Sequence, residues 1–443
     1  MKKSQPKLIY VPLESYQSRY TQQWSAPKTG WLERRWIKAG INYIRIDPDQ
    51  GKKNRVIKVG SVLDAVGRST YSFSQIQELL YMAERGEITD KDVIYFDDFW
   101  TPGVEALKYT FHLMGLNPFM YAFLHAQSVD EFDFTRKMRP WIRSIEIGYG
   151  QIFDGIFTSC PTLRDKIVEG GIAGAKNVYA LGHPICVEEM LSRCPKDYQN
   201  FINGKKVSKA VRNKYEQRSP SVVFSSRLDK EKNPHFFLDV MEKVQREDRL
   251  LDQPITKFII CSGNAEIKSN ISGLKHRLLD LEKKNVNFEL RLNLTKEQYY
   301  KILCESAVQF NCADQDFVAM TLYDALVCGC VPVYPNFRSF PEVWGNAGLH
   351  FCDVPKLYKH RDKDEAVCSI MNAIDTIHPR NWQSLDWIQD IHRDFLGHFD
   401  DVWEQMITVM NVDLFKKKYK RTHSHPDITV FEETIDLYGD SDY

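Results

Sequence analysis

The sequence has no excess of either charge: 59 lysine and arginine residues balance 59 aspartate and glutamate residues. Binding to nucleic acid must therefore come from local basic patches and not from the chain as a whole. There is also no uninterrupted apolar run of the roughly eighteen residues that a membrane-spanning helix needs. The apolar run near the N-terminus is too short for a secretory leader. We therefore expect a cytoplasmic protein without a membrane span.

The ten cysteines are dispersed, and no two stand in the CxxC spacing of zinc and redox motifs. Most lie among apolar residues, as buried free thiols in a reducing compartment do. We therefore expect neither a disulfide framework nor a zinc site.

The 443 residues leave room for two domains. Short apolar runs alternate with helical patterns, first over the N-terminal half and again after residue 220, which is typical of parallel sheets covered on both faces. The expected strands are 8–13, 41–46, 92–96, 119–124, 155–159 and 178–184, then 221–225, 256–262, 286–292, 307–312, 330–334 and 348–351. The predicted fold is α/β, with Rossmann-like domains at 1–185 and 220–384, a basic connector at 186–219, a closing helix at 385–412 and a flexible tail at 413–443.

The segment 226–234 reads SRLDKEKNP and separates an expected strand from an expected helix. Asn233 and Pro234 suit the start of that helix. The loop thus lies at the carboxyl end of a strand, where open α/β sheets bind ligands. Arg227 offers a guanidinium fork and Lys232 a point charge, both suited to a diphosphate. A solvated turn before a helix is the alternative interpretation.

Two carboxylates eight positions apart, Asp316 and Asp324, bracket the start of another expected helix. Asp324 can complete a capping box with Thr321. It can also accept hydrogen bonds from ribose hydroxyls, while Asp316 accepts them from a sugar. In that interpretation the amides of Met320 and Thr321 bind an anion at the helix start.

These motifs resemble the retaining glycosyltransferases of family 4, which have the GT-B fold of two Rossmann-like domains facing a central cleft. The segment 316–333, DFVAMTLYDALVCGCVPV, is similar to the Glu-x7-Glu motif of that family, with both glutamates shortened to aspartates. The segment 226–234 resembles its G-R-L-x-x-E-K-N loop, and FPEV at 340–343 resembles its I-P-E-V segment. In the first half, Thr29-Gly30 and Leu124-His125 stand where the family has a phosphate turn and a histidine.

The resemblance implies transfer of a sugar, with retention, from a nucleoside diphosphate donor such as a UDP-sugar, with no cofactor and no bound metal. It implies catalytic roles for His125, Asp316, Arg227 and Lys232. The implied donor-binding residues are Gly30, Ser226, Arg227, Lys232, Gly263, Arg291, Asp316, Ala319, Met320, Thr321 and Asp324. Phe317, Ala319 and Ser226 replace glycines of the family pattern, which allows less close backbone approach.

Three features favour a nucleic-acid acceptor: the basic segment 193–218 with interleaved aromatics, the basic run 416–421, and a loop whose side chains can contact a base. The expected acceptor-binding residues are Arg19, Tyr20, Trp24, Asp97, Asp98 and His125. A weaker resemblance of the opening segment to phage-encoded DNA-pyrimidine glycosyltransferases suggests a hydroxylated pyrimidine in DNA, which would have to be flipped from the duplex. The alternatives are a glycan, lipid or small-molecule acceptor, a nucleotide-sugar epimerase, and a catalytically inactive binding module.

Overall fold

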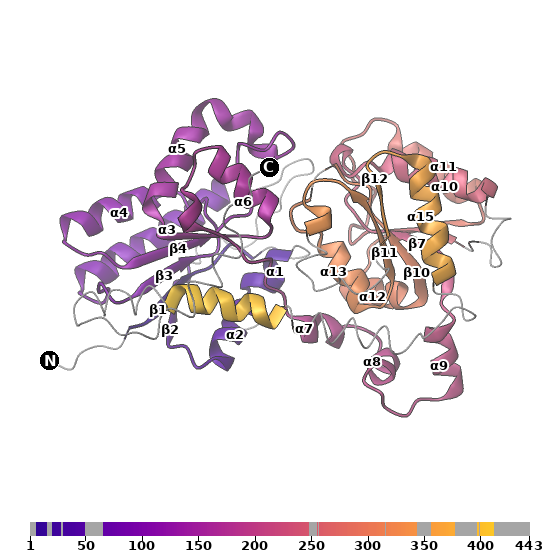
Figure 1. Ribbon diagram of the computed structural model, residues 1–443, viewed down its shortest axis with the longest axis horizontal. Helices are drawn as coiled ribbons and strands as arrows, with labels where there is room; N and C mark the ends of the chain where they lie inside the picture. The colour runs from indigo at the N-terminus through magenta and orange to yellow at the C-terminus, as the bar shows by residue number, and fades with distance from the viewer. Residues whose placement is uncertain are drawn as a thin grey trace, which may run out of the picture.

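Two parallel six-stranded sheets organise the molecule, one in each half of the chain (Figure 1). The computed structural model describes residues 6–15, 20–27, 30–48, 65–247, 255, 257–314, 316–342, 356–376, 397 and 399–411. Arg19, the side chain of Tyr20, the expected strand 348–351 and the tail with the run 416–421 lie outside the described residues.

The first sheet has the strand order β2-β1-β3-β4-β5-β6. Its strands are β1 (Leu8–Val11), β2 (Tyr43–Arg45), β3 (Val93–Phe96), β4 (Phe119–Phe123), β5 (Gly155–Thr158) and β6 (Val178–Ala180). The accompanying helices are α1 (Tyr20–Ser25), α2 (Trp31–Lys38), α3 (Ala65–Glu84), α4 (Val104–Leu113), α5 (Arg139–Ile152) and α6 (Pro161–Glu169), with the 3-10 turns η1 (Phe134–Met138) and η2 (Ala175–Asn177).

The second sheet has the order β12-β11-β10-β7-β8-β9. Its strands are β7 (Ser219–Phe224), β8 (Lys257–Cys261), β9 (Phe288–Arg291), β10 (Ser306–Phe310), β11 (Val331–Asn336) and β12 (Lys356–Lys359). Its helices are α10 (Pro234–Glu247), α11 (Leu274–Lys284), α12 (Lys296–Glu305), α13 (Met320–Val327) and α15 (Lys363–Thr376), with the 3-10 turn η3 (Lys230–Lys232). The predicted fold class, two Rossmann-like α/β domains, is confirmed.

Alternation of side chains explains why both faces of each sheet are buried. Along β1, Tyr10 packs into one apolar cluster and Ile9 into another on the opposite face. In the second sheet, Phe224 and Val223 divide in the same way. The cluster that holds Tyr10 also holds Val223, so one apolar core continues from the first domain into the second.

One local prediction is wrong. The sequence pattern predicts a helix capped by Ser74 that runs to about Arg85. In the structure α3 already begins at Ala65, and the Ser74 hydroxyl donates to the carbonyl of Tyr71 within the helix. The sixth strand of the second sheet is β12 at Lys356–Lys359, in a polar segment with no apolar run. The position of β12 at the edge of the sheet follows from its parallel pairing with β11.

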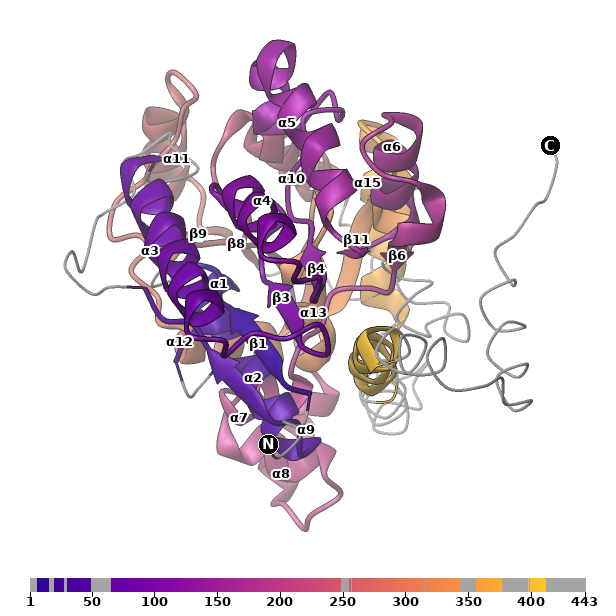
Figure 2. The same cartoon turned by 90° about the vertical axis from the view of Figure 1, so that its left-hand side faces the viewer.

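Three short helices, α7 (Val187–Ser192), α8 (Lys196–Ile202) and α9 (Lys209–Glu216), link the domains (Figure 1). Residues 399–411 form a helix that returns to the first domain (Figures 1 and 2). Its Trp403 Nε1 donates to the carbonyl of Ile185 at 3.1 Å. In the described part of the chain, no helix is both long and apolar enough to cross a membrane.

The carboxyl ends of the two sheets face each other. Just past β5, the hydroxyl of Ser159 donates to the carbonyl of Phe317 at 3.1 Å. Nearby, the amide of Thr162 donates to the carboxylate of Glu342 at 2.8 Å. Because loops at the carboxyl ends of parallel strands bind ligands in such sheets, we expect the ligand-binding site at this domain boundary.

Candidate donor and acceptor site

The loop after β7 is tied to the loop after β10. Asn233 was predicted to cap α10, but it adopts a left-handed conformation with φ of 49°. Its side-chain amide donates to the carbonyl of Cys312 at 3.1 Å and to the carboxylate of Asp314 at 2.7 Å. The predicted cap is therefore wrong, because the amide joins two strand-end loops instead.

Lys232 is directed into the structure and meets the first carboxylate of the motif. Its side chain is 9% exposed, and Nζ lies 3.2 Å from Oδ2 of Asp316. Arg227 is half exposed and lies at the rim, where Asp229, at 2.7 Å, and Glu231 hold its guanidinium. The structure thus brings Arg227, Lys232 and Asp316 into one neighbourhood, with one buried cation and one accessible cation.

Asp324 lies one turn into α13, with its carboxylate 4% exposed. The Nζ of Lys296 lies 3.0 and 2.9 Å from its two oxygens, and the hydroxyl of Tyr300 donates to it at 2.6 Å. The helix is preceded by Ala319 as its N-cap, without a side-chain cap. Thr321 therefore lies inside the helix, and the predicted capping box is wrong.

Of the two amides expected to bind an anion at the start of α13, one is engaged within the chain. The amide of Met320 donates to the carbonyl of Val318 at 2.8 Å, so it is engaged by the backbone. The hydroxyl of Thr321 lies 2.9 Å from the hydroxyl of Tyr334 on β11. Without the glycines of the family pattern, the chain closes on itself at Ala319, which is fully buried.

Lys296 and Tyr300 were missed by sequence reasoning. Both stand on α12, whose capping box at Thr295 and Gln298 is a local signal for the helix but not for a site. Lys296 also lies 5.2 Å from the ring of Tyr299, whose hydroxyl donates to Ser225 Oγ at 2.9 Å. These contacts connect Asp324 to the loop after β7, next to Ser226.

The residues expected around the base lie at the ends of neighbouring strands. Gly263 follows β8, where an added Cβ would find its nearest contact 3.5 Å away at the carbonyl of Leu294. Arg291 ends β9, and its guanidinium lies 2.6 Å from the carboxylate of Glu289 on the same strand. Arg291 is thus held along its own strand.

In the first domain, Asp97 does not face an acceptor, contrary to expectation. Its carboxyl is fully buried and accepts from the hydroxyl of Tyr10 and, at 3.1 Å, from the amide of Leu13. Burial raises the pKa of Asp97 to about 7. Asp98 instead binds Arg68 at 2.7 Å.

His125 lies just past β4, and its Nε2 is 2.7 Å from the carbonyl oxygen of Asp97. Because a carbonyl only accepts, Nε2 carries the hydrogen and Nδ1 is the acceptor. Burial lowers the pKa of His125, so the ring is neutral at neutral pH.

Trp24 was predicted to stack on an acceptor base, and the structure shows otherwise. It is 1% exposed, with its ring 5.5 Å from that of His125 and 4.4 Å from that of His183. Gly30, predicted as a donor residue, is the N-cap of α2, and a Cβ there would lie 2.7 Å from the carbonyl of Trp24. A glycine is needed there to let α2 start against α1.

The connector does not present aromatic rings to a nucleic acid. Tyr198, Phe201 and Tyr215 are buried, because they pack the connector helices onto the core. Lys214 is paired with Glu305 at 2.9 Å. The interleaved aromatic residues of 193–218 therefore belong to the core, and they do not support the expected nucleic-acid contact.

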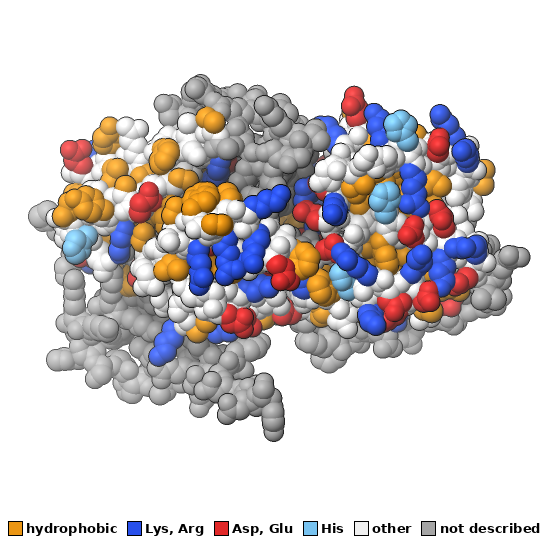
Figure 3. Space-filling model, turned by 90° about the horizontal axis from the view of Figure 1, so that it is seen from above, with side chains coloured by type: hydrophobic (Ala, Val, Ile, Leu, Met, Phe, Trp, Pro, Cys, Tyr) orange, Lys and Arg blue, Asp and Glu red, His pale blue; other side chains and the backbone are white. Residues whose placement is uncertain are grey.

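A basic surface on η1 and α5 was not predicted from the sequence, although the run RKMR at 136–139 indicates it. It consists of Arg136, Lys137, Arg139, Arg143 and the 57% exposed Trp141. In the described part of the chain, none of the four cations forms an ion pair with a carboxylate. Three of the arginines line a hollow of about 550 Å³. Figure 3 shows the face that carries α5, with lysine and arginine side chains gathered near the domain boundary.

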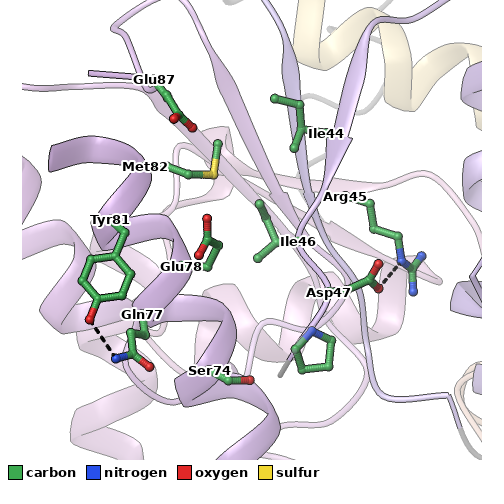
Figure 4. Close-up of a pocket in the computed structure, with 11 residues that line it drawn as sticks. Ile44, Arg45, Ile46, Asp47, Ser74, Gln77, Glu78, Tyr81, Met82 and Glu87 are labelled. Carbon is green, nitrogen blue, oxygen red and sulfur yellow. Dashed lines mark hydrogen bonds and ion pairs between the residues drawn. The ribbon is translucent and has the colours of Figure 1, made fainter. Parts of the chain in front are cut away.

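Another hollow, of about 460 Å³, lies between β2 and α3 on the first domain (Figure 4). Ile44 and Ile46 line it from one side and Glu78, Tyr81 and Met82 from the other. None of the predicted site residues lines it.

The fold defines the class of protein. A trehalose 6-phosphate synthase from Burkholderia multivorans superposes over 96% of this chain and 100% of its own, with a TM-score of 0.59 and 12% identity. An E. coli structure described as trehalose-6-phosphate bound with UDP-2-fluoro glucose covers 91% of this chain and 98% of its own, with a TM-score of 0.57 and 11% identity. The chain therefore has the GT-B glycosyltransferase fold.

The chain is also similar in sequence to part of a curated protein. This relative is the tRNA-queuosine alpha-mannosyltransferase of Drosophila melanogaster, 27% identical over 156 residues. The match covers 32% of this chain and 38% of the relative, so it spans less than half of that protein. No protein-family profile matches the chain.

Proposed function

We propose that the protein is a retaining glycosyltransferase that moves a sugar from a nucleoside diphosphate donor to a hydroxyl group of a nucleoside in a nucleic acid. The GT-B fold and the mannosyltransferase relative support glycosyl transfer. The observation that carries the proposal is the contact of Lys232 with Asp316 between the loops after β7 and β10. Cations and carboxylates at the carboxyl ends of neighbouring strands suit a charged sugar nucleotide.

In the proposed reaction the oxygen of the acceptor hydroxyl bonds to the anomeric carbon while the bond between that carbon and the diphosphate oxygen breaks. The diphosphate leaves with the electron pair and takes up the proton of the hydroxyl. Lys232 and Arg227 offset the negative charge that develops on it, which is the task a metal ion performs elsewhere. We therefore propose that the donor site needs no metal or cofactor. A UDP-sugar is the first donor to test, because the E. coli structural neighbour is bound with UDP-2-fluoro glucose.

The carboxylates and His125 position the sugar nucleotide. Asp316 exchanges part of its contact with Lys232 for sugar hydroxyls, and Asp324, held by Lys296, accepts from the ribose. A carboxylate has about four lone-pair sites, so Asp324 can keep Lys296 while it accepts a hydroxyl. The acceptor nitrogen Nδ1 of His125 orients a hydroxyl of the transferred sugar or of the acceptor.

The acceptor is inferred from charge and from the relative. The basic surface of η1 and α5 starts four residues after Phe132, whose ring lies 6.4 Å from that of Phe337 across the domain boundary. Unpaired cations beside an exposed tryptophan are the means by which proteins hold phosphates and stacked bases. The relative is a tRNA-queuosine alpha-mannosyltransferase, which favours a modified nucleoside in RNA as the acceptor. A hydroxylated pyrimidine in DNA is the second candidate, on the resemblance of the opening segment.

A matrix of donors and acceptors tests the proposal. The purified protein is incubated with UDP-glucose, UDP-N-acetylglucosamine or GDP-mannose and with queuosine-containing tRNA, hydroxymethylated duplex DNA or no acceptor. The acceptor is then digested to nucleosides, whose masses and anomeric configuration are measured. A sugar attached with retention, absent in Lys232→Ala, supports the proposal.

Other outcomes separate the alternatives. A donor converted to its epimer without transfer indicates an epimerase. Donor binding without any turnover, across all donors and acceptors, indicates an inactive binding module and contradicts the proposal. Transfer to free sugars or lipids alone would retain glycosyl transfer but overturn the nucleic-acid acceptor.

A further inference from the structure

Three thiols from distant parts of the sequence meet in the interior. Cys194 follows α7, Cys304 lies near the end of α12, and Cys328 directly follows α13. All three side chains are buried, with exposures of 5%, 0% and 0%. Their sulfur atoms lie within 4.8 Å of one another. Such a cluster is invisible in sequence spacing, because its members approach only when the connector packs on the second domain.

The sulfur separations suit a shared metal ion. The Sγ atoms of Cys194 and Cys328 are 3.8 Å apart. A disulfide would bring them to about 2.05 Å. Two thiolates bound to one tetrahedral ion at about 2.3 Å lie roughly 3.8 Å apart, and in trigonal planar coordination roughly 4.0 Å. The observed separation therefore corresponds to an edge of a metal–thiolate site.

A buried cation stands beside the cluster. Arg218 is 6% exposed, and in the described part of the chain no carboxylate pairs with it. One guanidinium nitrogen donates to the carbonyl of Cys328 at 2.8 Å, while Nη2 is buried without a hydrogen-bond partner among the described residues. An isolated buried charge is costly unless a counter-charge lies near. Three thiolates around a divalent ion carry one net negative charge, and around a monovalent ion two, which supplies that counter-charge.

We propose that Cys194, Cys304 and Cys328 bind one thiophilic d10 cation, Zn²⁺ or Cu⁺, as a structural site between the connector and the second domain. Soft thiolate ligands select such ions.

The site would fix two helices that also carry the donor-site ion pair. Cys304 and Lys296 are on α12, and Cys328 and Asp324 are on either side of the last turn of α13. An ion that joins the sulfur atoms holds the carboxyl ends of both helices together. Lys296, at the amino end of α12, is then held opposite Asp324. The bound ion thus stabilises the Lys296–Asp324 pair, although the ion itself does not contact the substrate.

Metal content and spectroscopy test this proposal on the full chain. The protein is purified under reducing conditions, and zinc and copper are measured by mass spectrometry. The apoprotein is then titrated with Co²⁺ or, anaerobically, with Cu⁺. We expect one ion per chain and thiolate-to-metal charge-transfer absorption. Both are lost in Cys304→Ser and kept in the matched control Cys330→Ser, which alters another fully buried cysteine outside the cluster.

Chelation should lower the thermal midpoint of the wild type and of Cys330→Ser but leave that of Cys304→Ser unchanged. If Cys304→Ser does not fold, Cys194→Ser replaces it, and X-ray absorption of the wild type counts the sulfur neighbours. Absence of metal and of charge-transfer absorption in the wild type overturns the proposal. So does equal metal binding by Cys304→Ser, which would place the ion at the more exposed Cys186 or Cys368, and so does a Cys194–Cys328 disulfide in the protein as isolated.

Discussion

Lys296 and Asp324 form an ion pair that joins α12 to α13, with Nζ 2.9 and 3.0 Å from the two carboxylate oxygens. The carboxylate is 4% exposed, and the lysine side chain is 31% exposed. The hydroxyl of Tyr300 adds a third hydrogen bond. The second acidic residue of the motif is therefore held by partners that do not belong to the motif, and it has a structural task beside the proposed ribose contact.

Replacing Asp324 with asparagine should affect both tasks. The amide keeps one acceptor oxygen but no charge, so Lys296 loses its ionic partner. We expect the free energy of unfolding to fall by about 1–3 kcal/mol, and donor affinity to fall as well. Urea denaturation and donor titration measure the two effects. The control Asp364→Asn, which breaks the exposed pair with Lys243, should change neither. Unchanged donor affinity in Asp324→Asn would assign the pair to stability alone.

Replacing Lys232 with alanine should mainly reduce turnover. This cation is 9% exposed and lies against Asp316, where the leaving diphosphate is proposed to develop charge. Loss of one such group typically lowers kcat by about 10²–10³-fold. Donor turnover by the purified variant checks this, with the exposed neighbour Lys230→Ala as the control. Wild-type turnover in Lys232→Ala would remove the residue from the mechanism.

The fold could be predicted because apolar runs such as those of β1 and β7 are local signals. The motif at 226–234 also predicted a loop at the carboxyl end of a strand, and Lys232 in this loop lies 3.2 Å from Asp316. Lys296 could not be predicted, because nothing near it in sequence shows that α12 packs on α13. The prediction for Trp24 failed for a related reason. An aromatic residue in a polar segment reads as exposed, yet Trp24 lies on α1 with its ring packed 4.4 Å from that of His183.

Asp97 should make stability depend on pH. Its carboxyl has an ordinary pKa of 3.8 in the unfolded chain and, through burial, about 7 in the folded one. Between these values only the folded state holds the proton, so stability falls as pH rises from about 4 to about 7 and then levels off. The loss should be on the order of 3 kcal/mol between about pH 5 and about pH 8.

Asp97→Asn tests this sign, because asparagine cannot ionise but can still accept from Tyr10 and from the amide of Leu13. We expect the variant to lack the wild-type decline in stability over that pH range. Urea denaturation at several pH values measures the difference, with the surface variant Asp239→Asn as the control. A decline of the same size in Asp97→Asn would show that other groups cause it.

The basic surface of η1 and α5 should account for nucleic-acid affinity and for its dependence on salt. We expect the triple variant Arg136→Ala, Arg139→Ala, Arg143→Ala to bind tRNA or duplex DNA more weakly. The slope of the logarithm of the binding constant against the logarithm of salt concentration should fall in magnitude by about one per lost phosphate contact. Fluorescence anisotropy over a range of salt concentrations gives both quantities.

Trp141→Ala should weaken binding by about 1–3 kcal/mol at every salt concentration if a base stacks on it. Removal of three exposed lysines of α11 (Lys275, Lys283, Lys284) is the matched control, since it takes away the same charge from the other domain. If the control lowers the slope as much as the arginine variant does, the attraction is not local to η1 and α5, and the surface is not the acceptor site.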